Sequence, residues 1–153
     1  AFKNILLCII TCGNQKIWDK NPNAGVTKAK HVYIGPLAKK CREYAEMFYQ
    51  SSWCILSAKH GFLFPDDTRP LPYNVSFNDK KTNPITTEEL SAQVAEKGLD
   101  KCNKIVVLGG KKYIEIIKEV FSTKEILTPL SGCKGNGYMQ GRLKDAIKRG
   151  APL

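Results

Sequence analysis

The fold is decided by the stretch Trp53-Cys54-Ile55-Leu56-Ser57-Ala58-Lys59-His60-Gly61-Phe62-Leu63-Phe64-Pro65, in which a short apolar run leads into a polar cluster that ends in glycine. A short, continuous apolar run is typical of a strand that is buried on both faces of a parallel sheet. Open α/β sheets bind their ligands just beyond the carboxyl ends of such strands. His60, one of two histidines in the chain, is therefore the first candidate functional residue.

Three more apolar runs, rich in β-branched residues, predict further strands: Ile5 to Thr11, Lys104 to Leu108 and Glu125 to Thr128. Apolar residues at helical spacing predict helices over 37–49, from 86 onwards, over 111–121 and over 138–149. Strands that alternate with helices form a parallel sheet covered on both faces. We therefore expect a single α/β domain over residues 1–153, with three layers and a mainly parallel central sheet of about four or five strands.

The longest irregular segment, residues 61–84, contains four of the eight prolines and is too long for a simple connection. It carries four aromatic residues, Phe62, Phe64, Tyr73 and Phe77. We therefore expect an ordered loop that packs over the edge of the sheet. Shortly after it, Thr86 and Glu89 form a capping box that starts the next helix.

The composition favours a polyanionic partner. The 153 residues are 42% hydrophobic and carry a formal net charge of +10, which suits a globular protein that binds nucleic acid or a nucleotide. No apolar run approaches the length of a membrane span, and no basic region with a cleavable apolar core opens the chain. We therefore expect a cytoplasmic protein with no membrane contact. Lysine-rich surfaces also serve solubility alone, and that alternative stays open.

Six cysteines lie mostly in or beside apolar segments, and none forms a C-x-x-C pair: Cys8, Cys12, Cys41, Cys54, Cys102 and Cys133. Structural zinc sites need closely spaced ligands. We therefore expect buried free thiols, no metal site and no cofactor.

Four segments that follow the predicted strands combine glycine with lysine: 12–16, 57–61, 109–113 and 131–137. The carboxyl ends of parallel strands meet at one edge of a sheet, so we expect these segments to lie together. Glycine exposes backbone N–H groups and lysine adds a mobile positive charge, which suits a phosphate or another anion. The predicted ligand-binding residues are Cys12, Gly13, Asn14, Lys16, Lys59, Tyr73, Asn74, Gly109, Gly110, Tyr113, Ser131 and Lys134. The alternative is a set of solvated turns.

His60 is the main candidate for catalysis, because the pKa of histidine lies near neutrality and suits a general acid or base. Asp66 follows closely enough to orient the imidazole, and Ser57 follows a buried strand as a nucleophile would. Structural alternatives remain: His60 bonds the loop to the sheet, Asp66 caps a turn, and Ser57 lacks a G-x-S-x-G elbow. Cys12, near Lys16, is either a thiol with a depressed pKa or, more commonly for such a position, a buried structural residue.

Two groups of residues fit a nucleotide or nucleic-acid ligand. Tyr73 and Asn74 offer a stacking face and a base-reading amide, or alternatively an ordinary turn. Arg142, Lys148 and Arg149 lie on the last predicted helix, where they would contact phosphates or form a solvated face.

A specific pattern is formed by Ser57-Ala58-Lys59-His60-Gly61, Pro72-Tyr73-Asn74 and the strand end Gly109-Gly110. With it the chain resembles a family of small bacterial, archaeal and phage proteins classed as a domain of unknown function. The segment from Leu56-Ser57 through Gly61-Phe62-Leu63 to Pro72-Tyr73 is also similar to the YaaA-like peroxide-stress proteins, which are associated with DNA binding.

The last third of the chain has a second distant likeness. Val106-Val107-Leu108-Gly109-Gly110 and Thr128-Pro129-Leu130-Ser131-Gly132 resemble the closing strands and the Ser-Pro-Leu-Ser loop of uracil-DNA glycosylases, whose sheet is similar to one module of archaeosine tRNA-modifying enzymes. Thr128 stands where the glycosylase motif has histidine. The likeness therefore implies nucleic-acid chemistry without implying uracil excision.

The residues and resemblances together support three functional hypotheses. The leading one is a nucleotide or nucleic-acid binding protein, extending to an enzyme that acts on a nucleobase or its N-glycosidic bond in nucleic-acid modification or repair. The second is a non-catalytic DNA-binding stress protein. The third is an enzyme acting on a small anionic metabolite.

Overall fold

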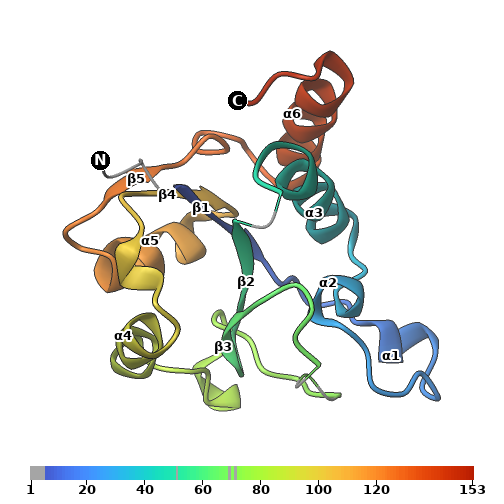
Figure 1. Ribbon diagram of the computed structural model, residues 1–153. Coiled ribbons are helices and arrows are strands. Elements are labelled where there is room, and N and C mark those ends of the chain that lie inside the picture. The colour runs from blue at the N-terminus through green and yellow to red at the C-terminus, as the bar shows by residue number, and fades with distance from the viewer. Residues whose placement is uncertain (1–5, 51, 69, 71) are drawn as a thin grey trace.

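In the part of the chain that the structure describes, five strands form one sheet in the order β3-β2-β1-β4-β5 (Figure 1). The strands are β1 (Leu6–Thr11), β2 (Trp53–Ser57), β3 (Gly61–Leu63), β4 (Lys104–Leu108) and β5 (Glu125–Leu127). The structure is a computed structural model, and it describes residues 6–50, 52–68, 70 and 72–153. The predicted first strand begins at Ile5, which lies outside the described residues.

The helices are α1 (Ile17–Lys20), α2 (Ala29–Val32), α3 (Pro36–Phe48), α4 (Thr87–Glu96), α5 (Lys111–Val120) and α6 (Asn136–Arg149), with short 3-10 helices at Lys80–Thr82 and Leu99–Lys101. Helices α3, α5 and α6 begin and end within two residues of their predicted positions, and α4 begins one residue after its predicted cap. The predicted capping box is confirmed at α4, where Thr86 and Glu89 each bond the other's backbone N–H. None of the helices described is both long and apolar enough to cross a bilayer.

The central strand, β1, determines how the layers form. It pairs in parallel with β2 on one side and with β4 on the other, and β4 pairs in parallel with β5. Side chains alternate across a strand, so Cys8 and Ile10 of β1 enter one core while Leu7 and Ile9 enter the other. This burial on both faces explains why the strand sequences are continuously apolar.

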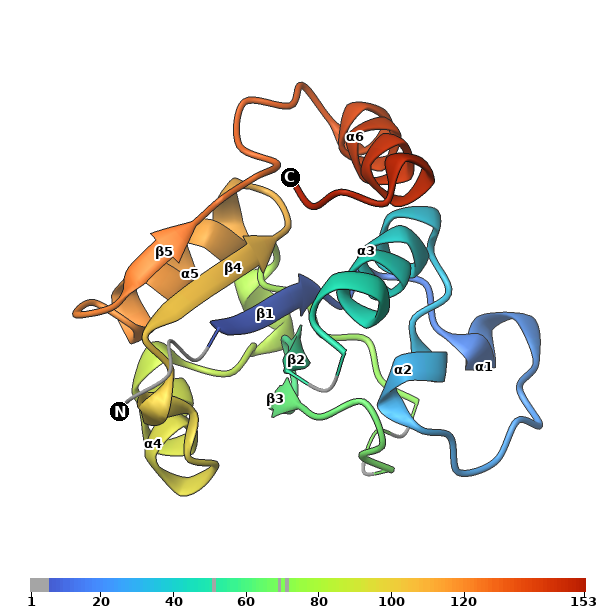
Figure 2. The same ribbon diagram turned by 45° about the horizontal axis from the view of Figure 1, so that its top comes forward.

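Each core is closed by two of the longer helices. The core that contains Cys8 and Ile10 is covered by α3 and α6, which pack against one another, and the opposite core is covered by α4 and α5 (Figure 2). The arrangement confirms the predicted three-layer α/β fold with a mainly parallel sheet.

The strand order creates a switch point beside β1. The chain runs from β1 through α3 to β2 on one side, and later reaches β4 on the other side of β1. The connections that leave the carboxyl ends of β1 and β4 therefore diverge to opposite faces of the sheet. In open α/β sheets, this divergence leaves a crevice in which ligands bind.

The prediction of irregular structure throughout residues 61–84 is wrong at its start, because Gly61–Leu63 forms strand β3, antiparallel to β2. Three apolar residues are too few to show a periodicity. Ala58, Lys59 and His60 connect the paired residues Ser57 and Gly61 of this hairpin.

Gln93 of α4 holds the hairpin closed. Its side-chain oxygen accepts a hydrogen bond from the Phe62 N–H at 2.9 Å, and its side-chain nitrogen donates to the His60 carbonyl at 2.9 Å. Gly61 has a φ of 76°, in the left-handed region that favours glycine. A Cβ at this position would overlap the Gln93 amide.

We predict that Gly61→Ala lowers the free energy of unfolding by about 2–4 kcal/mol, because it adds left-handed strain and breaks the bonds made by Gln93. Gly98→Ala is the matched control. Gly98 has a φ of 70°, but a Cβ there would meet no atom within 4 Å, so strain alone should cost about 1–2 kcal/mol. Urea denaturation measures both, and equal losses would contradict the role given to Gln93.

Candidate functional site

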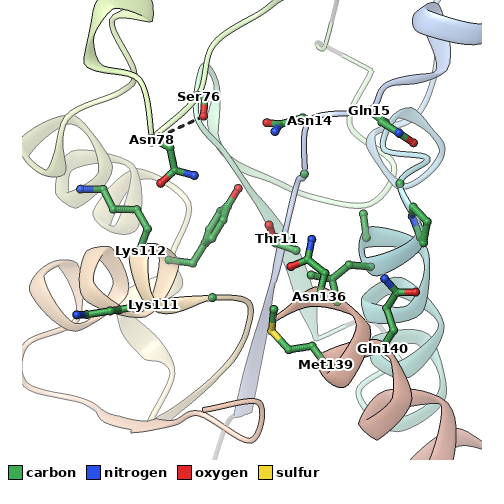
Figure 3. A pocket seen from close by; sticks show the side chains of 17 residues that line it. Thr11, Asn14, Gln15, Ser76, Asn78, Lys111, Lys112, Asn136, Met139 and Gln140 are labelled. Carbon is green, nitrogen blue, oxygen red and sulfur yellow. Dashed lines mark hydrogen bonds between the residues drawn. The ribbon is translucent and has the colours of Figure 1, made fainter. Parts of the chain in front are cut away.

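A cavity of about 440 Å³ lies at the switch point, beyond the carboxyl ends of β1 and β4 (Figure 3). Its wall combines the segment after β1, the start of α3, the start of α5, the start of α6 and a turn of the long loop. The polar side chains in this wall belong to Thr11, Asn14, Gln15, Ser76, Asn78, Lys111, Lys112, Tyr113, Asn136 and Gln140. Distant parts of the sequence thus supply a single site.

Three of the described helices point their N-termini at this cavity. Their N-cap residues are Gly35 for α3, Gly110 for α5 and Gly135 for α6, and glycine has no side chain with which to cap a helix. The first-turn N–H groups of a helix have no partner within the helix and carry partial positive charge. At α4, by contrast, the Thr86 hydroxyl accepts such a bond. The cavity wall therefore includes the starts of three helices whose N-cap residues make no side-chain hydrogen bond to the first turn.

Gly135 is suited to this position by its backbone. Its φ is 152° and its ψ is −179°, a conformation that is largely restricted to glycine. The chain therefore passes through a nearly extended glycine as the β5–α6 connection enters α6 at the wall of the cavity.

Side-chain amides converge on the cavity from three separate elements. Asn14 follows β1, Asn78 lies on the long loop and Asn136 begins α6, and their amide groups point toward one another across the cavity (Figure 3). The Asn78 backbone N–H donates to the Ser76 hydroxyl at 3.2 Å, which steadies the loop turn. Each amide provides both donors and an acceptor, as is needed to read the edge of a nucleobase.

The charged groups around the cavity are positive. Lys111 and Lys112 are exposed at the start of α5, and their ammonium groups point away from the other side chains of the wall, toward the rim of the cavity (Figure 3). None of the described residues that line the cavity is Asp, Glu or His. An anion in the cavity would therefore lie near the first-turn N–H groups, with the two lysines at the rim and no carboxylate among the described residues of the wall.

Tyr113 forms an aromatic part of the wall. Its hydroxyl lies 3.3 Å from the Cys12 sulfur, and its ring meets the buried Phe77 ring edge to face at 5.7 Å. Burial raises the pKa of the Cys12 thiol, despite the nearby Lys16 charge. Burial likewise raises the pKa of Tyr113. The structure thus favours the buried structural role for Cys12 over an activated thiol.

Behind the Asn14 segment lies a cluster of three hydroxyls. The Tyr73 hydroxyl is 2.6 Å from that of Tyr33 and 2.8 Å from that of Ser57. Burial raises the pKa of Tyr73 to about 12, so this hydroxyl stays protonated at neutral pH. The Ser57 hydroxyl also accepts hydrogen bonds from the Lys59 and His60 backbone N–H groups, which ties the hairpin to the cluster.

Lys16 connects this cluster to the cavity. Its side chain is buried, its ammonium lies 4.3 Å from the centre of the Tyr73 ring, and it donates to the Asn14 carbonyl at 3.2 Å. Cation–π attraction and this hydrogen bond offset part of the cost of burying the charge. Lys16 therefore fixes the backbone of Asn14, whose side chain lines the cavity.

Of the four predicted glycine–lysine segments, three reach the cavity wall, through Gly13 and Asn14, through Gly110 and Tyr113, and through Asn136. The fourth, 57–61, does not line the cavity in the described structure; it forms the hairpin. His60 packs edge to face against Tyr73 at 5.3 Å, and Lys59 lies 5.7 Å from the centre of the same ring. Because Lys16 also lies over the Tyr73 ring, this ring links the hairpin to the segment that follows β1.

Asp66 lies at a different hollow, which is lined also by Lys30, Phe64 and Trp53. Its carboxylate is 3.2 Å from the Lys30 ammonium and 3.5 Å from that of Lys28. The hydrogen bond from Lys30 and the charge of Lys28 hold the pKa of this exposed carboxyl below its ordinary value. In the described structure Asp66 thus pairs with two lysines, and its orientation of His60 stays a prediction.

The other predicted residues are spread more widely. Asn74 and Ser131 are exposed, and Gly109 is buried where a Cβ would lie 3.3 Å from the Tyr113 Cβ. Lys134 and Arg142 line a separate hollow beside α6. Lys148 and Arg149 lie in the last turn of α6, where Arg149 pairs with Asp145 at 3.0 Å.

Sequence reasoning missed several residues of the cavity wall: Thr11, Gln15, Ser76, Asn78, Lys111, Lys112, Asn136 and Gln140. The lysines and Asn136 lay inside the segments already singled out, so counting every polar residue there would have included them. No sequence pattern marks Ser76 and Asn78, because only the folded loop brings them to the cavity.

The fold and the cavity define a class: a doubly wound α/β protein with a polar cavity at its switch point. Residues 7–140 match the model of a family of unknown function, DUF6884, and the chain belongs to that family. It is 43% identical over 143 residues to the uncharacterized protein YfjM of Bacillus subtilis strain 168, an alignment that covers 93% of this chain and 95% of that protein. No solved structure matches the chain. The expected membership of a family of unknown function is thereby confirmed.

We predict that Tyr73→Phe lowers the free energy of unfolding by about 1–2 kcal/mol, because it leaves the buried Tyr33 hydroxyl with one partner fewer. Tyr138→Phe is the control, since Tyr138 is exposed and its hydroxyl can bond to water. That change should stay within about 0.5 kcal/mol of the unchanged protein in urea denaturation. A loss of similar size in both variants would contradict a structural role for the hydroxyl cluster.

Proposed function

We propose that the cavity binds a nucleotide, either as a separate molecule or as part of a nucleic acid. The observation that supports it most strongly is the convergence of three glycine-capped helix N-termini with three side-chain amides in a wall without carboxylates. Helix N-termini suit a phosphate, whereas amides suit a base. Only a ligand that combines the two uses both sets of groups.

The position of each group supports a division of the site. Lys111 and Lys112 stand at the N-terminus of α5, so the phosphate would lie on this side. Asn14, Asn78 and Asn136 would meet the base, and the Tyr113 ring offers it an aromatic surface. A volume of about 440 Å³ is within the range for sites that hold a small organic ligand.

Binding is favoured over proton transfer at this site. The described lining residues include no carboxylate or imidazole, and burial raises the pKa of Tyr113. Catalysis by His60 on a nucleobase or its N-glycosidic bond remains a prediction from the sequence, as do a DNA-binding stress protein and an enzyme for a small anionic metabolite.

Calorimetric titration with the four common nucleoside 5′-monophosphates, the matching nucleosides and inorganic phosphate tests the proposal. We expect at least one nucleoside monophosphate to bind more tightly than its nucleoside and than phosphate. The double variant Lys111→Ala/Lys112→Ala should weaken that binding by about 10-fold, because it removes two charges near the phosphate.

The matched control is Lys118→Ala/Lys144→Ala, which makes the same charge change at exposed lysines outside the cavity wall. It should change the affinity less than about two-fold at physiological salt, where screening is strong. Equal effects of the two double variants, or no binding of any nucleotide at low salt, would refute the proposed site.

A second prediction concerns the amides. Asn78→Asp keeps the shape of the side chain but replaces its two donor hydrogens by an acceptor. The added negative charge should weaken the binding of every anion, inorganic phosphate included, by a similar factor. If this amide reads a base, the order of affinities among the four nucleoside monophosphates should change as well. Asn74→Asp, at an exposed residue outside the cavity wall, is the control for the added charge. An unchanged order in Asn78→Asp would exclude this residue from base recognition.

A further inference from the structure

The hollow beside α6 that Lys134 and Arg142 line is open to solvent, and we call it the α6 hollow. It is lined by Lys134, Tyr138, Arg142, Cys133 and three glycines. A Cβ added to Gly132, Gly137 or Gly141 would meet no other atom within 4 Å, so the hollow is shallow and open at its glycines. Its floor is therefore accessible to a flat ligand.

Tyr138 lines the α6 hollow, and 69% of its surface is exposed. None of the other large exposed apolar side chains of the described residues lines the hollow. A protein partner would favour a broader apolar surface, because apolar burial drives most such associations. A single accessible ring between glycines instead offers a face for one planar group.

The charge of the region is uniformly positive. No Asp or Glu occurs from Ile126 to Lys144. Lys134 and Arg142 flank Tyr138 in the hollow, and the Arg142 guanidinium uses one donor on the Pro129 carbonyl at 2.8 Å. A guanidinium has five donors, so others remain for a phosphate. An aromatic face between cations is the pattern that binds single-stranded nucleic acid.

The start of α6 joins the two hollows. Asn136 and Gln140 line the cavity at the switch point, whereas Gly137, Tyr138 and Gly141 line the α6 hollow. Between them lies the N-terminus of α6, whose first N–H groups suit a phosphate. A single nucleotide cannot occupy both hollows, because a helix about 10 Å wide separates them.

We propose that the ligand is a single strand of nucleic acid, which places one nucleotide in the cavity, passes a phosphate over the N-terminus of α6 and stacks a later base on Tyr138. This inference rests on the nucleotide site proposed above and names the class of molecule that occupies it. DNA and RNA share the required chemistry of alternating bases and phosphates.

The test uses the full chain and fluorescein-labelled hexamers of uracil nucleotides in the deoxyribose and ribose forms, measured by fluorescence anisotropy at low salt. A hexamer without bases but with the same phosphates, and hexaglutamate, serve as polyanion probes. We expect one of the uracil hexamers to bind about 10-fold or more tightly than its mononucleotide and than either polyanion, because stacking adds to charge. Which hexamer it is distinguishes DNA from RNA.

Tyr138→Ala should weaken hexamer binding by about 10-fold, Tyr138→Phe should retain it, and neither should alter mononucleotide affinity. Phe64→Ala, at an exposed ring of another hollow, should leave hexamer binding unchanged. Arg142→Ala should lower the slope of log affinity against log salt by about 1.

The two proposals fail in different ways. If mononucleotides bind but uracil hexamers bind no more tightly, or if Tyr138→Ala leaves hexamer affinity intact, the strand inference is overturned and the nucleotide site stands. Equal affinity for hexaglutamate or for the hexamer without bases also overturns it, because charge alone would then explain binding. If no nucleotide enters the cavity, both are lost.

Discussion

The parallel pairing of β1 with both β2 and β4 is the constraint on which the rest of the structure depends. It buries β1 on both faces, and it sends the chain to opposite faces of the sheet from two adjacent strand ends. Helices that return across such a sheet begin near its carboxyl edge. The N-termini of α3, α5 and α6 therefore gather where the side chains of the sheet no longer fill space. The strand order therefore determines where the cavity lies, and the particular residues determine how its wall is lined.

Much of the fold could be predicted because strand and helix signals were local and strong. The continuous apolar runs of β2 and β4 and the capping box at Thr86 are patterns within a few residues, and the structure has them where the sequence placed them. Strand β3 was missed because its pairing with β2 depends on Gln93, more than 30 residues away. A three-residue strand has no pattern of its own.

The candidate site could be predicted only in part, for a related reason. Parallel strands place their carboxyl ends together, which was sufficient to expect Asn14, Gly110 and Tyr113 near one another. The conspicuous segment that contains His60 instead forms a hairpin whose contacts explain much of its composition: Ser57 accepts bonds from the turn, and Gly61 makes room for Gln93. Asn78 reaches the cavity through a long loop, and no local rule fixes where such a loop will lie.

The glycine N-caps at positions 35, 110 and 135 affect both the stability of their helices and the N–H groups that the cavity wall exposes. Compared with glycine, a capping side chain adds only about a few tenths of a kcal/mol to a helix, and this protein forgoes that gain at Gly35 and Gly110, whereas the φ of 152° at Gly135 requires glycine in any case. Serine or aspartate at position 35 or 110 would make those two helices slightly more stable, but its side-chain oxygen would accept hydrogen bonds from the first-turn N–H groups at the cavity. The protein thus keeps a slightly smaller margin against unfolding at this edge of the sheet than capped helices would give it, and an anion bound in the cavity would enlarge that margin.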